Sequence, residues 1–488
     1  MNKEQDNRPN ILLIITDQQR GDCVGIDPHA PSVLQTPNLD FIGRSGTHFH
    51  HAYTECPSCI PARRSLMTGT APAANGAVGY QGGIDWNPKH TLPGELARAG
   101  YQTQLIGKLH LHPDRKRYGF QHMQLANATR GETKHNDYVD WLRERHGRTE
   151  TDPGMSHGVD PNGWVGRPHL LPEEQMHTFW CFDQAMQFLK TRDPSAPYFL
   201  KISVIDPHPP LTPPAFYYQR YIDRKIPSPV VGDWAPNFGG PQKGLATDAS
   251  EIHLPEQDMR CARAAYYGMI NFVDDQVGRL MQFEANEARE WFIIFTSDHG
   301  EMLGDHNLYR KTWPYEASAR IPFLVRAPDS WDLPGEQVCE SPVGLQDVMP
   351  TILDATGVDI PDTCTGKSLL PIIRGDATAV RDFLHGEHSG CYRNDQGNHF
   401  LTDGHEKYIW YSQTGVEQLF DLDADPHETV NLADKPNAQN TLGAWRAKLV
   451  VILDGRPEGF TDGKSLVPGR PHGTLLPGYD PDAQYPFL

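Results

Sequence analysis

The sequence is poor in cysteine, in positive charge and in long apolar runs, and each shortage argues against a class of protein. Eight cysteines among 488 residues are too few for a disulfide scaffold, and their spacing matches no zinc ribbon. The formal net charge of −18, with no compensating basic run, argues against nucleic acid or an anionic membrane as a partner. An anionic substrate would therefore need a local pocket of positive charge.

The N-terminal region also lacks the features of a targeting segment. MNKEQDNRPN is polar and has none of the apolar character of a signal peptide, so we expect a cytoplasmic protein. A secreted or periplasmic protein whose leader had been removed would look the same. The run ILLIIT that follows is six residues long, which suits a buried strand and is far too short to span a membrane.

Short apolar runs alternate with helical patterns through the first three quarters of the chain. Strands are expected at residues 11–16, 101–107, 198–205 and 291–297, and helices at residues 36–45, 91–99, 258–285 and in the segment that ends at Gly357. This alternation predicts an α/β fold with a large, mostly parallel sheet flanked by helices. From about residue 380, short runs separated by Asp-Gly and Asp-Pro turns predict a short antiparallel sheet. We therefore expect a main domain over residues 1–378 and a smaller α+β subdomain with an extended tail over residues 379–488.

Polar residues follow four of the expected strands directly. They are Asp17 and Gln18, Lys108 and His110, Asp206 and His208, and Asp298 and His299. In sheets of this kind the chemistry gathers at the carboxyl ends of the strands, so one crevice would collect all of these side chains. Two aspartates, a glutamine and a histidine suit a divalent cation such as calcium, magnesium or manganese. Taken singly, an aspartate after a strand is more often a turn or helix-cap residue.

The segment ECPSCIPARRSLMTG, at residues 55–69, contains two overlapping cysteine patterns. Cys56 and Cys59 form a C-x-x-C, but a redox motif would open a helix in a small thioredoxin-type unit, and zinc would need a second Cys or His pair nearby. Cys59 also begins C-x-P-x-R, in which Pro61 favours the first turn of a helix. A helix N-terminus together with Arg63 would stabilise a thiolate, or an oxygen nucleophile made from this side chain. Without these neighbours, an inert buried thiol would be the favoured interpretation of Cys59.

The C-I-P-A-R segment followed by RSLMTG resembles the signature of the type I sulfatases, in the alkaline phosphatase-like superfamily. The resemblance continues in IGKLHL at 106–111, TSDHGEMLGDH at 296–306, KTWPYEASARIP from Lys311 to Pro322, and LFDLDADPHETVNLA at 419–433. A lone C-x-P-x-R would be weak evidence. The segments occur in the expected order over nearly the whole chain. Together they imply an alkaline phosphatase-like fold and a catalytic domain over residues 1–378.

The resemblance also implies a mechanism. A maturation enzyme, the formylglycine-generating enzyme, would oxidise Cys59 to Cα-formylglycine, whose hydrated form attacks the sulfur of a small-molecule or oligosaccharide sulfate ester. One divalent metal, calcium first and manganese or magnesium next, would be held at the modified Cys59 by Asp17, Gln18, Asp298 and His299. Positive charge for the sulfate would come from Arg63, Lys108 and Lys311. By the same resemblance His110 would act as the base, and His208 and Lys311 would protonate the leaving oxygen.

Two features leave alternatives open. Many sulfatases carry paired Asp after the first strand, and the Asp17-Gln18 pair found here also occurs in phosphonate monoester hydrolases, the rival family. Those relatives lack the Lys108 and His110 of GKLHLH, which favours sulfate esters here. A phosphatase of the alkaline phosphatase type would use Ser or Thr as nucleophile and two metals. A degenerate member of the family that only binds an anion would lack some of the catalytic residues. Among sulfate esters we expect a carbohydrate, or else an aryl alcohol, with the HGEHSGCYR segment at 385–393 near the site.

Overall fold

Four continuous apolar runs form the centre of the largest sheet. The structure is a computed structural model that describes residues 7–127, 136–148, 159–244, 246–284, 287 and 289–480. The strands are β1 (Asn10–Asp17), β2 (Thr47–Phe49), β3 (Ala52–Tyr53), β4 (Gln102–Gly107), β5 (His122–Leu125), β6 (Tyr198–Pro207), β7 (Trp291–Ser297), β8 (Phe323–Arg326), β9 (Gln337–Cys339), β10 (Val343–Gly344), β11 (Leu384–His388), β12 (Asn398–Thr402), β13 (Glu406–Tyr411) and β14 (Glu417–Asp421). The predicted strands correspond to β1, β4, β6 and β7, so these predictions are confirmed.

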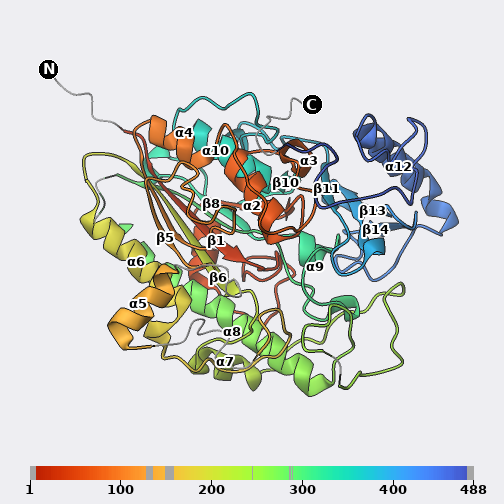
Figure 1. Cartoon of the computed structure of the whole chain (residues 1–488), viewed down its shortest axis with the longest axis horizontal. Coiled ribbons are helices and arrows are strands. Elements are labelled where there is room, and N and C mark those ends of the chain that lie inside the picture. The colour runs from red at the N-terminus through yellow and green to blue at the C-terminus, as the bar shows by residue number, and fades with distance from the viewer. Residues whose placement is uncertain are drawn as a thin grey trace.

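Helices lie on both faces of this sheet (Figure 1). The α-helices are α1 (Pro37–Arg44), α2 (Cys59–Thr68), α3 (Pro72–Asn75), α4 (Leu92–Arg98), α5 (Asp137–His146), α6 (His177–Thr191), α7 (Ala215–Ile222), α8 (Glu256–Met281), α9 (Glu316–Ala319), α10 (Val348–Ala355), α11 (Leu370–Ile373) and α12 (Gln439–Leu453). The helix expected over 258–285 is α8, which ends at Met281, and residue 285 lies outside the described residues. The other three expected helices are α1, α4 and α10.

The large sheet has eight strands in the order β5-β4-β6-β1-β7-β8-β2-β9. Its first five strands in this order run parallel, as do β2 and β9, whereas β8 is antiparallel to both of its neighbours. Alternate residues of β1 enter two different cores because successive side chains of a strand point to opposite faces. Leu13 packs with residues of α2, α4 and α10, and Ile14 packs with residues of α1, α6 and α8. The mostly parallel sheet covered on both faces is therefore confirmed.

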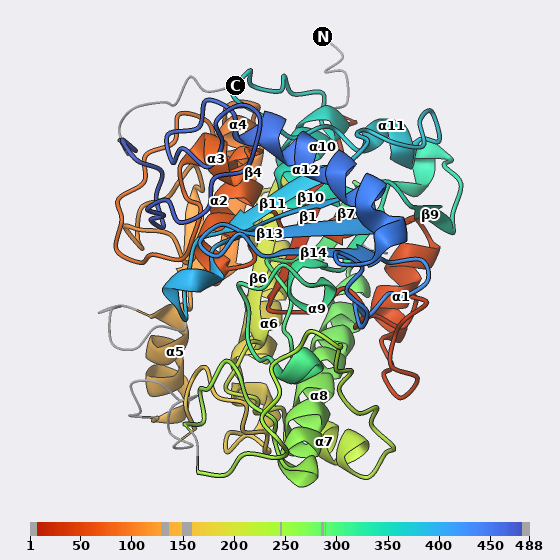
Figure 2. The same cartoon turned by 90° about the vertical axis from the view of Figure 1, so that its right-hand side faces the viewer.

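A second sheet of four antiparallel strands follows, in the order β11-β12-β13-β14. Phe400 and Ile409 on one face pack against the body of the protein, in a cluster that includes Tyr53. Trp410 on the other face packs in a cluster with Trp445 of α12, which lies across the sheet (Figure 2). The predicted antiparallel sheet is confirmed, whereas the expected boundary at residue 378 stays a prediction.

The chain after α12 has no helix and no strand longer than a single bridge as far as residue 480, and the last eight residues lie outside the description. This tail returns to the region of α3, where Val78 donates a backbone hydrogen bond to Thr474 (3.0 Å) and Leu476 donates one to Gly76 (3.0 Å). Nowhere in the described part of the chain is there a helix both long and apolar enough to cross a membrane.

Candidate active site

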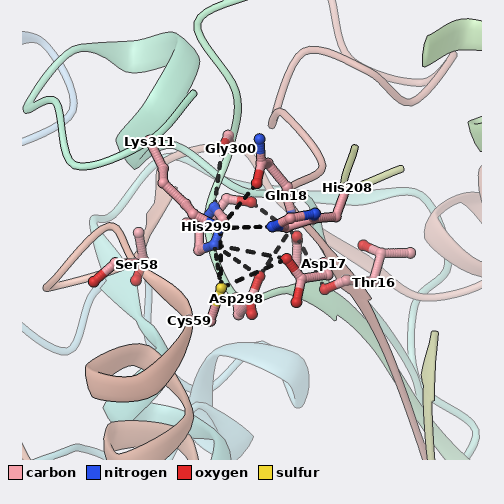
Figure 3. Close-up of polar contacts among 12 residues, drawn as sticks. Thr16, Asp17, Gln18, Ser58, Cys59, His208, Asp298, His299, Gly300 and Lys311 are labelled. Atoms are coloured by element: carbon pink, nitrogen blue, oxygen red, sulfur yellow. Dashed lines mark hydrogen bonds and ion pairs between the residues drawn. The ribbon is translucent and has the colours of Figure 1, made fainter. Parts of the chain in front are cut away.

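The carboxyl ends of β4, β6, β1 and β7 lie side by side because these strands are parallel neighbours in the sheet. The residues that follow them therefore meet at one edge of the sheet, together with the first residue of α2 and a loop residue that follows β7 (Figure 3). The predicted residues that the structure brings together are Asp17, Gln18, Cys59, Arg63, Lys108, His110, His208, Asp298, His299 and Lys311.

Cys59 is the first residue of α2, as the C-x-P-x-R pattern predicted. Its side chain is buried, with 1% of the residue exposed. The Sγ atom lies 3.1 Å from Lys311 Nζ, 3.2 Å from His299 Nε2, 3.9 Å from Lys108 Nζ and 3.7 Å from Asp17 Oδ1. Sγ occupies the position at which a formylglycine would carry its oxygen, so these contacts describe the surroundings of a nucleophile.

Positive charge dominates the electrostatics at Cys59. Burial and the Asp17 carboxylate raise the pKa of the thiol, but Lys108, Lys311 and His299 outweigh them, and the pKa lies well below its ordinary value. A negatively charged atom is therefore stabilised at this position although the site is buried. The same charges would favour the anionic group of a substrate.

Arg63 holds two carboxylates at the base of the site. Its Nε donates to Asp298 Oδ2 (2.9 Å) and its Nη2 donates to Asp17 Oδ2 (3.0 Å). Its Nη1 donates to Ser203 Oγ (2.8 Å) and to the backbone carbonyl of Lys108 (3.0 Å). Because a buried charge must be paired, Arg63 links the ends of β1, β4, β6 and β7 into one rigid unit. Contact of Arg63 with a substrate oxyanion stays a prediction.

Four side chains offer ligand atoms that lie within 4.8 Å of one another: Asp17, Cys59, Asp298 and His299. His299 Nδ1 lies 3.0 Å from the carbonyl of Gly300, which keeps a proton on Nδ1, while Asp298 raises the pKa of the ring. On metal binding Nε2 would release its proton and offer its lone pair to the ion. Burial and the Asp17 carboxylate raise the pKa of Asp298. A divalent cation would relieve this repulsion between the carboxylates, so the residues present fit a metal ion.

Gln18 is turned toward the site by a backbone φ of 70°, in the left-handed region that non-glycine residues rarely adopt. Its amide nitrogen donates to Glu301, which fixes the amide orientation, and its carbonyl oxygen accepts from Lys311 Nζ (3.0 Å). The backbone nitrogen of Gln18 donates to Asp298 Oδ1 (3.1 Å). Gln18 therefore borders the metal cluster, and its own role as a ligand stays a prediction.

Lys311 and His208 form a hydrogen-bonded pair, with 2.9 Å between Lys311 Nζ and His208 Nε2. Burial and Lys311 lower the pKa of His208 well below its ordinary value, whereas Cys59 and Asp17 raise the pKa of Lys311 against the effect of burial. The proton of the pair therefore lies on Lys311. His208 is a neutral imidazole whose Nδ1 lies 2.6 Å from the Pro209 carbonyl.

Lys108 directly follows the last residue of β4. Its Nζ lies 2.5 Å from Asp17 Oδ2. The preceding Gly107 has a φ of 97°, and a Cβ at this position would lie 2.1 Å from the Ser203 carbonyl oxygen. Only glycine fits this close approach of β4 to β6, so Gly107 determines the position of the Lys108 backbone.

His110 lies beside the nucleophile as a neutral imidazole. Burial and Lys108 lower its pKa to about 4, although Cys59 opposes them. His110 Nδ1 is buried and has no hydrogen-bond partner within the ranges that the structure describes, and the Tyr80 ring lies 6.1 Å away. A neutral imidazole with an unused nitrogen can accept a proton, which is the property that a general base needs.

Two residues at the site, Ser203 and Tyr392, were not singled out from the sequence. Ser203 of β6 holds Arg63, but a serine within an apolar strand carries no recognisable signal. His388 Nε2 lies 2.8 Å from Ser58 Oγ, next to the nucleophile, and the Tyr392 hydroxyl accepts from the backbone nitrogen of Lys311 (3.4 Å). The HGEHSGCYR segment that contains both residues was expected near the site, and the structure places it there.

The sequence matches the models of two known protein families. The model of the Sulfatase family matches residues 9–358, and the model described as the C-terminal part of N-sulphoglucosamine sulphohydrolase matches residues 304–453. The chain belongs to the sulfatase family. The first match covers the whole set of strand ends that carry the site.

This sulfatase is similar in sequence to a curated relative and in fold to two solved structures. It is 39% identical over 484 residues to an arylsulfatase of Clostridium perfringens, with 96% of this chain and 99% of the relative covered. Its fold is similar to that of a phosphonate monoester hydrolase of Agrobacterium radiobacter, with a TM-score of 0.74, 24% identity and 91% and 95% of the two chains covered. A protein solved with its substrate D-glucosamine-2-N,6-O-disulfate has a TM-score of 0.72, 19% identity and coverage of 91% and 97%. The sulfatase thus shares its fold with enzymes of two ester classes, and the curated relative from Clostridium perfringens is named for sulfate.

Proposed function

We propose that this sulfatase hydrolyses sulfate monoesters of a carbohydrate, through a formylglycine that a maturation enzyme makes from Cys59 and with the help of one divalent cation. The observation that carries the proposal is the placing of Cys59 Sγ against Lys311, His299 and Lys108, at 3.1, 3.2 and 3.9 Å. A sulfate monoester has a single negative charge, and its transition state moves charge onto the departing oxygen. Lys108 would supply positive charge on the nucleophile side, and Lys311 would supply it on the leaving-group side.

Calcium is the cation that we propose for the cluster of Asp17, Cys59, Asp298 and His299. When bound there, it would polarise the sulfate oxygens and favour ionisation of the nucleophile. Carboxylate oxygens suit a hard cation, and Gln18 beside them lowers the ligand charge compared with a second aspartate, so manganese and magnesium are the competing ions. Arg63 keeps both carboxylates in place by hydrogen bonds of 2.9 and 3.0 Å.

The proton transfers of the reaction would be carried out by His110 and Lys311, with His208 as the partner of Lys311. His110 is a neutral imidazole beside Cys59 and would take the proton of the nucleophile. Lys311 holds the proton that it shares with His208, and it would deliver that proton to the leaving alcohol oxygen. His208 then acts by fixing the direction of the Lys311 ammonium and by accepting part of its charge.

Hydrolysis of phosphonate monoesters or phosphodiesters is the second candidate function, supported by the fold shared with a phosphonate monoester hydrolase and by the Asp17-Gln18 pair. Lys108 and His110 favour the sulfatase over this candidate, because both lie beside the nucleophile and the rival family lacks them. Activity toward both ester classes in one enzyme is compatible with the shared site.

The substrate is tested with protein made together with a formylglycine-generating enzyme. Sulfated mono- and oligosaccharides, aryl sulfates and alkyl sulfates are compared by sulfate release under the same conditions. We expect the highest kcat/KM for a sulfated saccharide, in keeping with the solved relative bound to a sulfated glucosamine. An aryl sulfate preferred over every saccharide would instead match the named activity of the relative from Clostridium perfringens and would overturn the carbohydrate proposal.

A further inference from the structure

A second group of metal-ligating side chains lies where two parallel strands leave the edge of the large sheet. β2 and β9 pair in register as far as Phe49 and Cys339. The next residues are His50 and His51 on one segment and Glu340 on the other, and their ligand atoms lie within 4.8 Å of one another. None of these residues takes part in the site at Cys59.

The geometry of this group is close to that of a bound ion. Glu340 Oε2 lies 3.1 Å from His50 Nδ1 and 3.0 Å from His51 Nε2. Two ligand atoms bound to one tetrahedral zinc ion at its usual bond lengths are about 3.3 Å apart. The side chains of consecutive residues in a strand point to opposite faces, but the chain turns at residues 50 and 51, so both rings face the same carboxylate.

Backbone and neighbouring contacts hold the group in place before any ion binds. The His50 nitrogen donates to the Cys339 carbonyl (3.0 Å), and the Val343 nitrogen donates to the His51 carbonyl (3.0 Å). The His51 ring packs directly on Gly404, where a Cβ would lie 2.7 Å from the ring. The two histidines are therefore preorganised toward Glu340, and this reduces the entropy lost on binding.

A carboxylate stands behind one of the histidines, as is common around metal sites. His50 Nε2 lies 3.7 Å from Asp27 Oδ2, and Arg320 donates to the same oxygen of Asp27 at 2.6 Å. A carboxylate on the far side of the ring favours the proton on Nε2 and leaves the Nδ1 lone pair for a ligand.

We propose that His50, His51 and Glu340 bind one Zn²⁺ ion, with water completing the coordination. Two imidazoles and one carboxylate suit zinc better than calcium or magnesium, which prefer oxygen ligands alone. The ion can enter from solvent because the Glu340 side chain is 54% exposed, while the His50 and His51 side chains are 12% and 11% exposed. It joins the β2–β3 connection to the β9–β10 connection, between the large sheet and the two-stranded sheet of β3 and β10.

The test is equilibrium dialysis of the full chain against Zn²⁺ in excess Ca²⁺, with bound zinc measured per chain. His51→Gln and Glu340→Gln are compared with the wild type. We expect the wild type to hold one zinc ion more than either variant. The zinc affinity of the variants at this site should fall by more than about 100-fold, because changes to outer-shell groups alone commonly lower metal affinity by about 10- to 100-fold. Zn²⁺ should also raise the Tm of the wild type more than that of the variants, because the ion binds the folded chain.

His405→Gln is the matched control, because His405 lies next to His51 with a ring separation of 5.8 Å but is hydrogen-bonded to Asp423. This variant should keep the additional zinc ion and the increase in Tm. All three variants should retain wild-type sulfate ester turnover, which shows that they fold. The proposal is overturned if the wild type and the Glu340→Gln variant bind the same number of zinc ions, or if His405→Gln removes the ion as fully as His51→Gln does. Equal zinc in wild type and variants would mean that the group is only a hydrogen-bonded cluster.

Discussion

Cys56 and Cys59 differ in their surroundings although they belong to the same C-x-x-C. Burial and Glu387 raise the pKa of Cys56 well above its ordinary value, whereas lysines lower that of Cys59. We therefore expect Cys56→Ser to keep most of the activity and Cys59→Ala to lose at least about 10³-fold in kcat, as on removal of a nucleophile. Turnover of an aryl sulfate measures both, and mass spectrometry of the peptide around position 59 shows the conversion to formylglycine. Equal losses in the two variants would favour the C-x-x-C interpretation.

Lys311 is expected to matter most when the leaving alcohol is poor. Its Nζ holds a proton beside the nucleophile, and protonation of a poor leaving group contributes about 10²- to 10⁴-fold to rate. Lys311→Ala should therefore lose far more kcat on alkyl sulfates than on activated aryl sulfates, and His208→Ala should show the same trend.

Lys108→Ala is the control for this prediction, because Lys108 contacts Asp17 at 2.5 Å on the nucleophile side. Its loss should affect the two substrate classes to a similar extent. A Lys311→Ala variant with equal losses on alkyl and aryl substrates would show that Lys311 does not protonate the leaving oxygen.

At the scale of an element, the end of β4 depends on Gly107. A methyl group there would lie 2.1 Å from the Ser203 carbonyl oxygen, and the φ of 97° disfavours any side chain. We expect Gly107→Ala to destabilise the protein by about 1–3 kcal/mol and to lower turnover by displacing Lys108. Unfolding in urea and aryl sulfate kinetics measure the two effects.

Gly443→Ala in α12 is the matched substitution, because nothing lies within 4 Å of a Cβ at that position. It should leave turnover unchanged and stabilise the protein by up to about 1 kcal/mol through helix propensity. Similar behaviour of the two alanine variants would contradict the argument that β4 and β6 approach too closely at Gly107.

The elements that were predictable from the sequence are those with strong local signals. β1, β4, β6 and β7 are apolar runs followed by polar residues, and α2 begins at the cysteine that the Pro61 pattern indicated. β2 and β9 have three residues each and β8 runs antiparallel, so their positions depend on pairing with distant strands and not on local pattern. For the same reason no local pattern indicated that His50 and His51 meet Glu340, which the β2–β9 pairing brings together.

The candidate site was predictable in composition and less so in geometry. The motifs and their order along the sequence identified the residues at the strand ends. Parallel pairing of the strands explains why these residues meet. The pairing of Arg63 with both carboxylates, and the hydrogen bond that Gln18 accepts from Lys311, depend on side-chain packing that no spacing in the sequence encodes.

At the scale of the whole molecule, activity should depend on one divalent cation that remains bound when the His51→Gln substitution removes the proposed zinc ion. Chelation should abolish turnover, and Ca²⁺ should restore it, because the buried carboxylates repel each other without a cation. Asp298→Ala should lower both metal content and kcat. Metal analysis that found two zinc ions at the Cys59 cluster would indicate a phosphatase-type site instead.

The chain carries a net charge of −18, yet its site gathers the charged groups of Arg63, Lys108 and Lys311 around one nucleophile. The kcat/KM of the matured enzyme for a sulfate and a phosphonate ester of the same aryl alcohol tests this account most directly. We predict a clear preference for the sulfate ester and a large loss of that preference in Lys108→Ala. A preference for the phosphonate ester, with Lys108→Ala nearly unchanged, would contradict the sulfatase assignment and leave phosphonate hydrolysis as the function.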